Sequence, residues 1–183
     1  MNTVQSTFDA LSAALSYPRE DHLEELTRSP ERIRAGDFQD REAQASAAEH
    51  LEAFVRNTKG LSPGEFEELY TRTFDINPVC SLEVGWHLFG ETYERGAFLV
   101  QMREVLRRCS VEESTELPDH LTLVLAAFGR MTLSEAEEFA SQRLVKAVNK
   151  MLEGFAGKEN PYEHILRAVS ILISQRAAAH VGA

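Results

Sequence analysis

Three side chains near the middle of the sequence have the spacing of a metal site. Glu83, His87 and Glu91 are four residues apart, so they would share one face of a helix, where carboxylate and imidazole groups can bind a metal ion together. Cys80 lies just before them and adds a thiol that a neighbouring base can activate. One hypothesis is therefore a metal-binding or enzymatic helical bundle built around Glu83, His87 and Glu91.

Other sequence features argue against catalysis. A di-iron helical bundle needs Glu-x-x-His pairs, but Val84, Leu117 and Pro161 stand three residues before three of the histidines. Cys80 and Cys109 are far apart, so they lack the pairing of a zinc site, and Cys80 is better explained as a small packing residue. Nucleophile-elbow, P-loop and dinucleotide fingerprints are also absent. We therefore expect no enzyme activity, no metal and no bound cofactor.

Composition indicates a soluble globular protein. With 183 residues, 43% apolar and 26% charged, the chain is long enough for one domain spanning residues 1–183. The two isolated cysteines favour a reducing compartment, which predicts a cytoplasmic protein. A net charge of -10 argues against a nucleic-acid partner, because phosphate binding depends on clustered lysine and arginine, and it favours a basic partner instead.

Neither a signal peptide nor a membrane span is expected. The first 16 residues lack a positive cluster, and no apolar run approaches the roughly 20 residues that a span requires, so we expect no stable membrane association. Arg107 and Arg108 resemble a twin-arginine export signal, but they lie in the middle of the chain and precede no apolar stretch. We interpret them as the solvated end of a helix.

Apolar residues recur every three to four positions through most of the chain, as they do on one face of a helix. These stripes cover residues 4–15, 43–55, 66–74, 98–106, 121–128, 145–152 and 165–173. No alternating pattern of convincing length suggests a strand. The sequence therefore predicts an all-α, single-domain bundle of about seven to nine helices.

Several helix boundaries have specific signals. Ser62 and Glu65 have the spacing of a capping box with Pro63 at the first helical position, and Pro78 should end that helix near Asn77. The same spacing in the pair Ser134 and Glu137 predicts a second start, for a helix that stops between residues 154 and 157. Residues 29–40 look like a loop. The connections at 77–82 and 109–118 are the two that we expect to shape a groove.

An ordered series of motifs covers roughly a third of the chain. It consists of Tyr70-Thr71-Arg72-Thr73-Phe74-Asp75, then His87, Gly90 and Glu94-Arg95-Gly96, then Glu116-Leu117-Pro118-Asp119-His120-Leu121. In order and spacing, this series resembles the family of molybdoenzyme assembly chaperones typified by the nitrate reductase delta subunit (NarJ) and its relatives TorD and DmsD. The resemblance implies a TorD-like helical fold and no catalysis. It also implies a cytoplasmic chaperone that binds the apo form of a molybdopterin-containing catalytic subunit, or its N-terminal leader peptide, until the cofactor is inserted.

The resemblance also implies a client-binding surface. Its candidate residues are Tyr70, Asp75, His87, Glu91, Glu94, Arg95, Pro118, Asp119 and His120. Several of these residues, and some beside them, also have a structural explanation. Tyr70 and Phe74 share a face with Phe66 and can be core residues, Arg95 can pair with a carboxylate in an internal network, and Gly96 can allow close helix approach. Asp119, placed after Pro118 in the first turn of a helix, can interact with the helix dipole or with an arginine of the client at the groove edge.

The chain departs from the family pattern at some positions. Thr122 and the pair Leu125-Ala126 stand where a proline and a Leu-Glu pair are usual, and Arg107, Arg108 and Cys109 replace the tyrosine and glycine usual near the end of the central helix. The subfamily therefore stays open: the client can be a nitrate reductase or a periplasmic relative acting on selenate, chlorate, dimethyl sulfide or a hydrocarbon. A helical adaptor unrelated to molybdoenzymes is a further alternative, and the protein can be a monomer or a dimer.

Overall fold

The periodic apolar segments fold into helices around one large apolar core, and a second, small cluster of buried residues consists of Leu106, Leu123 and Ala127. The computed structural model describes residues 3–19 and 22–178. Its helices are α1 (Thr3–Ala14), α2 (His22–Thr27), α3 (Ser29–Arg34), α4 (Arg41–Thr58), α5 (Pro63–Tyr70), α6 (Val84–Phe89), α7 (Tyr93–Arg108), α8 (Leu121–Phe128), α9 (Leu133–Phe139), α10 (Val145–Glu153) and α11 (Tyr162–Ala177), with π-helical turns η1 (Thr71–Asp75) and η2 (Ala140–Leu144). Over these residues there is no β-strand, only one isolated bridge, so the all-α prediction is confirmed.

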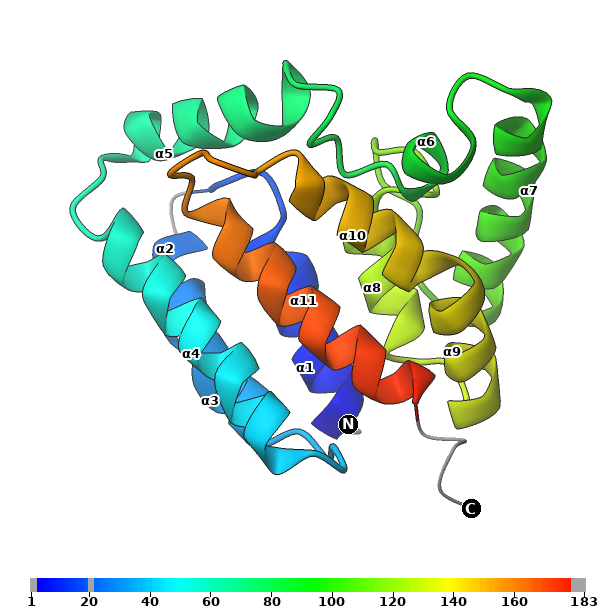
Figure 1. The fold of residues 1–183 in the computed structure, drawn as a ribbon, viewed down its shortest axis with the longest axis horizontal. Coiled ribbons are helices and arrows are strands. Elements are labelled where there is room, and N and C mark those ends of the chain that lie inside the picture. Colours follow the sequence, from blue (N-terminus) through cyan, green and yellow to red (C-terminus); the bar gives the residue numbers. More distant parts are fainter. Residues whose placement is uncertain (1–2, 20–21, 179–183) are drawn as a thin grey trace.

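The long helices form two layers. In Figure 1, α4 and α11 run side by side in opposite directions, and α10 folds back along the other side of α11. Helix α1 lies behind α11 and packs against α3 and α8. Helix α7 stands at the edge of the bundle and contacts α6 and α8, while α5 crosses one end. None of the helices in the described ranges is long and apolar enough to cross a membrane.

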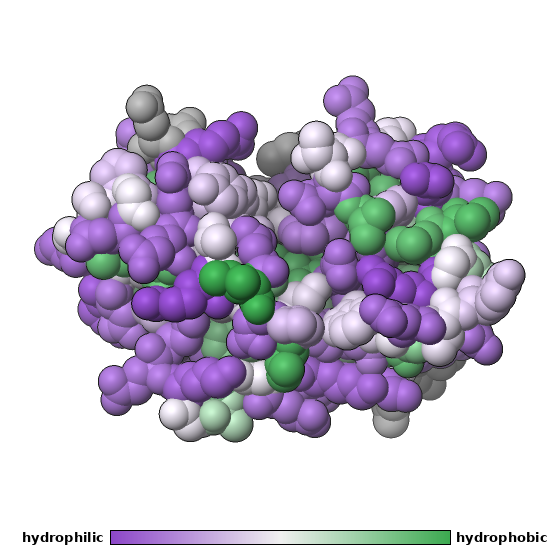
Figure 2. Space-filling model, turned by 90° about the horizontal axis from the view of Figure 1, so that it is seen from above, coloured by the Kyte–Doolittle hydropathy of each residue, from purple (hydrophilic) through white to green (hydrophobic). Residues whose placement is uncertain are grey.

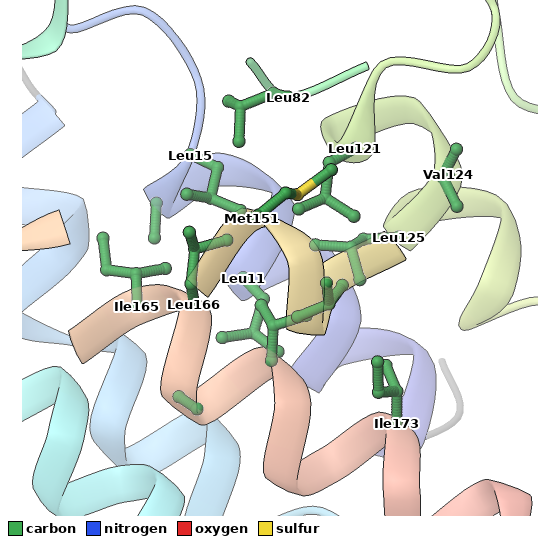
Figure 3. Packing of buried hydrophobic residues seen from close by; sticks show 14 of the residues in the cluster. Leu11, Leu15, Leu82, Leu121, Val124, Leu125, Met151, Ile165, Leu166 and Ile173 are labelled. Carbon is green, nitrogen blue, oxygen red and sulfur yellow. The ribbon is translucent and has the colours of Figure 1, made fainter. Parts of the chain in front are cut away.

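The core lies where α1, α8, α10 and α11 meet. Figure 3 shows Met151 of α10 between leucine side chains of α1 and α8 and apolar side chains of α11. All of these side chains are buried, and removing such groups from water is the main favourable term in folding. The labelled contributors are Leu11, Leu15, Leu82, Leu121, Val124, Leu125, Met151, Ile165, Leu166 and Ile173.

Helix α5 begins as the sequence predicts. The Ser62 hydroxyl accepts the Glu65 amide at 3.4 Å, and the Glu65 carboxylate accepts the Ser62 amide at 2.8 Å, which is the reciprocal capping box with Pro63 at its first turn. The helix continues as η1 and ends at Asp75, so the predicted end near Asn77 is confirmed to within two residues. A π-helical turn follows no side-chain pattern, and the sequence did not reveal it.

Two boundary predictions are wrong. The segment expected to be a loop contains α3, because a proline is compatible with the first turn of a helix and Ile33 is buried in the core. Helix α9 is capped by Thr132 with Glu135 rather than by Ser134 with Glu137. Both pairs have the same spacing. Because the helix starts after Thr132, Ser134 and Glu137 lie within it and do not cap it. The predicted stop at Gly154, which follows α10, is confirmed.

Two histidines meet across the α4 and α11 pair. The Nδ1 atoms of His50 and His164 are 3.0 Å apart. Burial lowers the pKa of both rings. The neighbouring His164 and Arg167 lower the pKa of His50 further, and the carboxylates of Glu49 and Glu163 raise it by less. The folded pKa values therefore lie below the unfolded value of 6.5, so the unfolded chain binds more protons in mildly acidic solution.

We expect His164→Gln to lose less stability than the wild-type protein when the pH falls from about 7.5 to about 5. The pair contributes stability above pH 6.5, and that contribution is lost as the pH falls below this value because protonation places two charges in contact. Urea denaturation at both pH values measures the difference. The other histidines are the same in both proteins, so they do not contribute to the difference. An equal loss of unfolding free energy in the variant and the wild-type protein would contradict this role of the pair.

Candidate functional site

Backbone hydrogen bonds bring two distant motif segments together. The Val84 amide at the start of α6 donates to the Asp119 carbonyl at 2.9 Å, and the Leu121 amide at the start of α8 donates to the Leu82 carbonyl at 2.7 Å. These residues are about 35 positions apart in the sequence, and nothing in the local pattern predicts their pairing. The pairing fixes α6 beside the segment that precedes α8.

Asp119 is buried at this junction. Its side chain is 0% exposed, and its Oδ2 accepts the Gly85 amide at 2.8 Å and lies 4.0 Å from Nε of Arg95. Burial raises the pKa of the Asp119 carboxyl, and the Gly85 amide and the Arg95 charge counteract that rise in part. The prediction that Asp119 occupies the first turn of a helix is wrong, because α8 starts two residues later with extended His120 as its N-cap.

Gly85 allows this close approach. A Cβ at that position would lie 2.6 Å from Oδ2 of Asp119 and 2.9 Å from Cδ1 of Phe98, closer than real contacts allow. Gly96 was expected to allow close helix approach, and that interpretation is wrong, since a Cβ there would have nothing within 4 Å. Gly96 lies on a face of α7 that no other element covers at that point.

We expect Gly85→Ala to destabilise the fold by about 1–3 kcal/mol, because the added methyl group displaces Asp119 or Phe98. Gly96→Ala is the matched control: the same change inside α7 meets open space and should stabilise the protein by up to about 1 kcal/mol through helix propensity. Thermal or urea denaturation of the two variants measures this difference. Equal effects of the two substitutions would contradict the close approach at Gly85.

Arg95 joins the two carboxylates of this junction. Its Nη2 lies 3.1 Å from Oε2 of Glu83, its Nε faces Asp119, and its guanidinium lies over the Trp86 ring at 5.6 Å from the centroid. The internal network expected for Arg95 is therefore confirmed. With its side chain 18% exposed, Arg95 has one side in the network and one side open to solvent.

A cleft of about 410 Å³ opens above this network. Both connections that were expected to shape a groove contribute to it, the 77–82 segment through Pro78, Ser81 and Leu82 and the 109–118 segment through Glu116. That prediction is confirmed. We call this site the acidic cleft; its lining residues are Phe74, Asp75, Pro78, Ser81, Leu82, Glu83, Trp86, Arg95, Glu116 and His120.

The charge of the acidic cleft is negative. Its lining residues include three carboxylates, those of Asp75, Glu83 and Glu116, and one arginine, Arg95. Asp75 and Glu116 are exposed and form no ion pair with a lysine or arginine in the described part of the chain, so their charges are free to attract a basic group. Burial lowers the pKa of His120, which favours the neutral ring despite the carboxylates around it.

Exposed apolar side chains flank the acidic cleft. Ile76 and Val79 lie beside its lining residues in the 76–83 connection and are 72% and 56% exposed, and Leu117 beside Glu116 is 41% exposed. Figure 2 looks down on the end of the molecule that carries α5 and this connection, and it shows apolar surface near the centre of a mostly hydrophilic face. An apolar patch next to uncompensated carboxylates suits a segment that is both basic and apolar.

The remaining candidate residues lie outside the acidic cleft. Tyr70 is buried in the core, where its hydroxyl donates to the Leu15 carbonyl at 3.1 Å and burial raises its pKa. The buried His87 ring contacts the Ser81 carbonyl at 2.7 Å, and burial lowers its pKa. Glu91 and Glu94 are exposed near the start of α7, and Pro118 is buried.

The alternative metal site lacks the geometry that it requires. Helix α6 ends at Phe89 and Gly90 has a φ of +61°, so Glu91 does not share a helix face with His87. Within residues 3–19 and 22–178, no three His, Cys, Asp or Glu side chains lie close enough to hold a metal ion. Burial raises the pKa of the Cys80 thiol, which opposes its use as a nucleophile.

Trp86 is a lining residue that sequence reasoning missed. It is the only tryptophan in the sequence, and its indole N–H donates to the Pro78 carbonyl at 3.1 Å. Its position between Glu83 and His87 was a usable signal, because tryptophan often anchors binding surfaces. Glu116, the first residue of the last motif block, was also not among the candidate residues. No local sequence pattern showed that the 116–120 segment folds back onto α6.

Comparisons with known proteins agree with the motif series. A family model described as the nitrate reductase delta subunit matches residues 39–164, a range that contains all lining residues of the acidic cleft. The probable nitrate reductase molybdenum cofactor assembly chaperone NarJ of Bacillus subtilis (strain 168) is 29% identical over 173 residues, 92% of this chain and 90% of that protein. The nitrate reductase molybdenum cofactor assembly chaperone NarJ of Escherichia coli (strain K12) is 27% identical over 135 residues, 73% of this chain, which spans only about half (46%) of that relative.

Proposed function

The chain belongs to the nitrate reductase delta subunit family, and from this premise we propose that it is a dedicated cytoplasmic chaperone for the catalytic subunit of a molybdoenzyme. It holds the apo-subunit until the molybdenum cofactor is inserted. The relatives in Bacillus subtilis and Escherichia coli are named as molybdenum cofactor assembly chaperones of nitrate reductase, and not as catalysts, which supports a binding protein rather than an enzyme.

The acidic cleft is the proposed client site, and one observation carries this assignment. Three motif segments that are far apart in the sequence bring Asp75, Arg95 and His120 to the same cleft. Their shared position supports a common role in binding. Asp75 and Glu116, which form no ion pair with a lysine or arginine among the described residues, attract a basic group, and the exposed Ile76 and Val79 contact an apolar side chain. The N-terminal segment of the catalytic subunit is the proposed occupant.

Moderate affinity follows from the size of the surface. Covering roughly 400 Å² of apolar area contributes about 10 kcal/mol at about 25 cal/mol per Å², and the cost of ordering a peptide and losing its free motion offsets much of this gain. The chaperone can therefore release its client after cofactor insertion. Because the site is open to solvent, the client can also bind and leave without opening of the apolar core.

Asp119 acts in this proposal as a positioning residue. It is fully buried and bonds the start of α6, so it holds Trp86 and Arg95 in place rather than contacting the client. Tyr70 and His87 likewise support the elements around the cleft. His120 and Asp75 line the cleft and are proposed to contact the client directly.

Cells lacking this protein test the proposed function. We expect their molybdoenzyme catalytic subunit to accumulate with little molybdenum, and a plasmid copy of the chaperone gene to restore the metal content measured by elemental analysis. The wild-type chaperone should also co-purify with the apo-subunit and not with the mature enzyme. Full molybdenum content in the deletion strain would overturn the proposal.

A further inference from the structure

Arg176, in the last turn of α11, is a partly buried arginine without a carboxylate partner. It takes part in no ion pair with a carboxylate among residues 3–19 and 22–178, and burial lowers its pKa. Its Nη2 donates to the Met131 carbonyl at 3.3 Å and its guanidinium lies over the Phe128 ring at 5.2 Å, while its buried Nε has no acceptor. A cation in this state usually needs compensation.

A cavity of about 440 Å³ lies beside Arg176. It is formed by the start of α1, the 37–39 segment, the start of α9 and the end of α11, with apolar walls from Phe38, Met131 and Leu133. Gln175 lines the same cavity, and its Nε2 is a second buried donor without an acceptor. Two neighbouring residues that line this cavity therefore each have a buried donor without an acceptor.

The nearest acidic residue does not supply the missing acceptor. Asp37 lines the cavity, but its side chain is 84% exposed and its Oδ1 lies 3.7 Å from Arg41, with which it forms an ion pair. The other lining residues are neutral. Because the whole chain carries a net charge of -10, its overall field repels anions, and an anion needs a local cation such as Arg176 to be held.

We propose that this cavity binds an oxyanion, a phosphate or a carboxylate, carried on an apolar body, with Arg176 as the partner of the anion. The guanidinium supplies a positive charge and a hydrogen-bond donor for the oxygens of either group, and the apolar walls cover the body of the ligand. The cavity lies at the opposite end of the bundle from the acidic cleft, so the inference is independent of the proposed client binding (Figure 1).

Calorimetric titration with small probes tests this inference. We expect phenyl phosphate or benzoate to bind the full chain with a dissociation constant on the order of 0.1–1 mM, and phenol and benzamide, which lack the charge, not to bind. Comparing phenyl phosphate with benzoate separates the two anion chemistries, and inorganic phosphate shows whether the apolar body contributes. Absence of binding by both aromatic anions at millimolar concentration would overturn the proposal.

Two arginine variants separate a binding role from a structural one. Arg176→Met should weaken anion binding at least about tenfold while keeping the unfolding midpoint of the ligand-free protein unchanged or higher, since it removes an unpaired cation. Arg167→Met is the matched control on the same helix, because Arg167 is exposed and pairs with Glu163. Unchanged anion binding by Arg176→Met, or an equal loss in Arg167→Met, would contradict the proposal.

Discussion

Replacing Asp75 and Glu116 together with lysine is expected to weaken binding of the client's N-terminal segment about 100-fold at low ionic strength. Both carboxylates line the acidic cleft, both are exposed, and neither forms an ion pair with a lysine or arginine in the described part of the protein; Glu116 lies 4.0 Å from the His120 ring, whose pKa burial lowers. The double change reverses the sign of the charge that faces a basic client. Titration calorimetry or fluorescence anisotropy with a synthetic client segment measures the loss.

The control carries the same change in net charge elsewhere. Glu31 and Glu42 are exposed on α3 and α4, outside the acidic cleft, so Glu31→Lys with Glu42→Lys should leave binding within about twofold of the wild-type value. Salt should weaken wild-type binding and narrow the gap between the two double variants. Equal losses in both would mean that net charge, rather than the cleft, attracts the client.

Asp119→Ala is expected to lower the free energy of unfolding by about 2–4 kcal/mol. The substitution leaves the buried Gly85 amide without an acceptor. It also removes one of the two carboxylates near Arg95, the one whose side chain is fully buried. Asp119→Asn keeps an acceptor of similar shape and should retain most of the stability. Urea denaturation followed by circular dichroism measures both variants.

Client binding by the same variants tests the positioning role. Asp119→Ala should also weaken client binding, because Trp86 and Arg95 lose their fixed places, although Asp119 itself is 0% exposed. If Asp119→Ala matched the wild-type protein in both stability and client binding, the buried junction would not support the cleft.

Local signals predicted the parts of this fold that depend on neighbouring residues. The capping box at Ser62, the stop before Pro78 and the burial of Phe74 each follow from a few adjacent side chains. The start of α9 was misplaced because two overlapping capping patterns compete, and only the packed structure selects Thr132. Helix α3 was missed because a six-residue helix has too few positions to show a period.

The candidate site depends on contacts between distant segments, which explains what sequence reasoning missed. Arg95 was correctly expected to pair with a carboxylate in an internal network, because charge-assisted hydrogen bonds of that kind are strong. The partners of that network, Gly85 and Asp119, meet only because the 116–120 segment pairs with the start of α6. No local pattern encodes that pairing, so Asp119 was expected at a groove edge although it is buried beneath the cleft.

The most direct measurement uses Trp86, the only tryptophan of the chain and a lining residue of the acidic cleft. Titrating the protein with a tryptophan-free N-terminal segment of its molybdoenzyme catalytic subunit should change the Trp86 emission saturably, with the same midpoint that calorimetry gives. Binding seen by calorimetry with no change in that emission would place the client elsewhere on the surface. Absence of binding by either method would contradict the account.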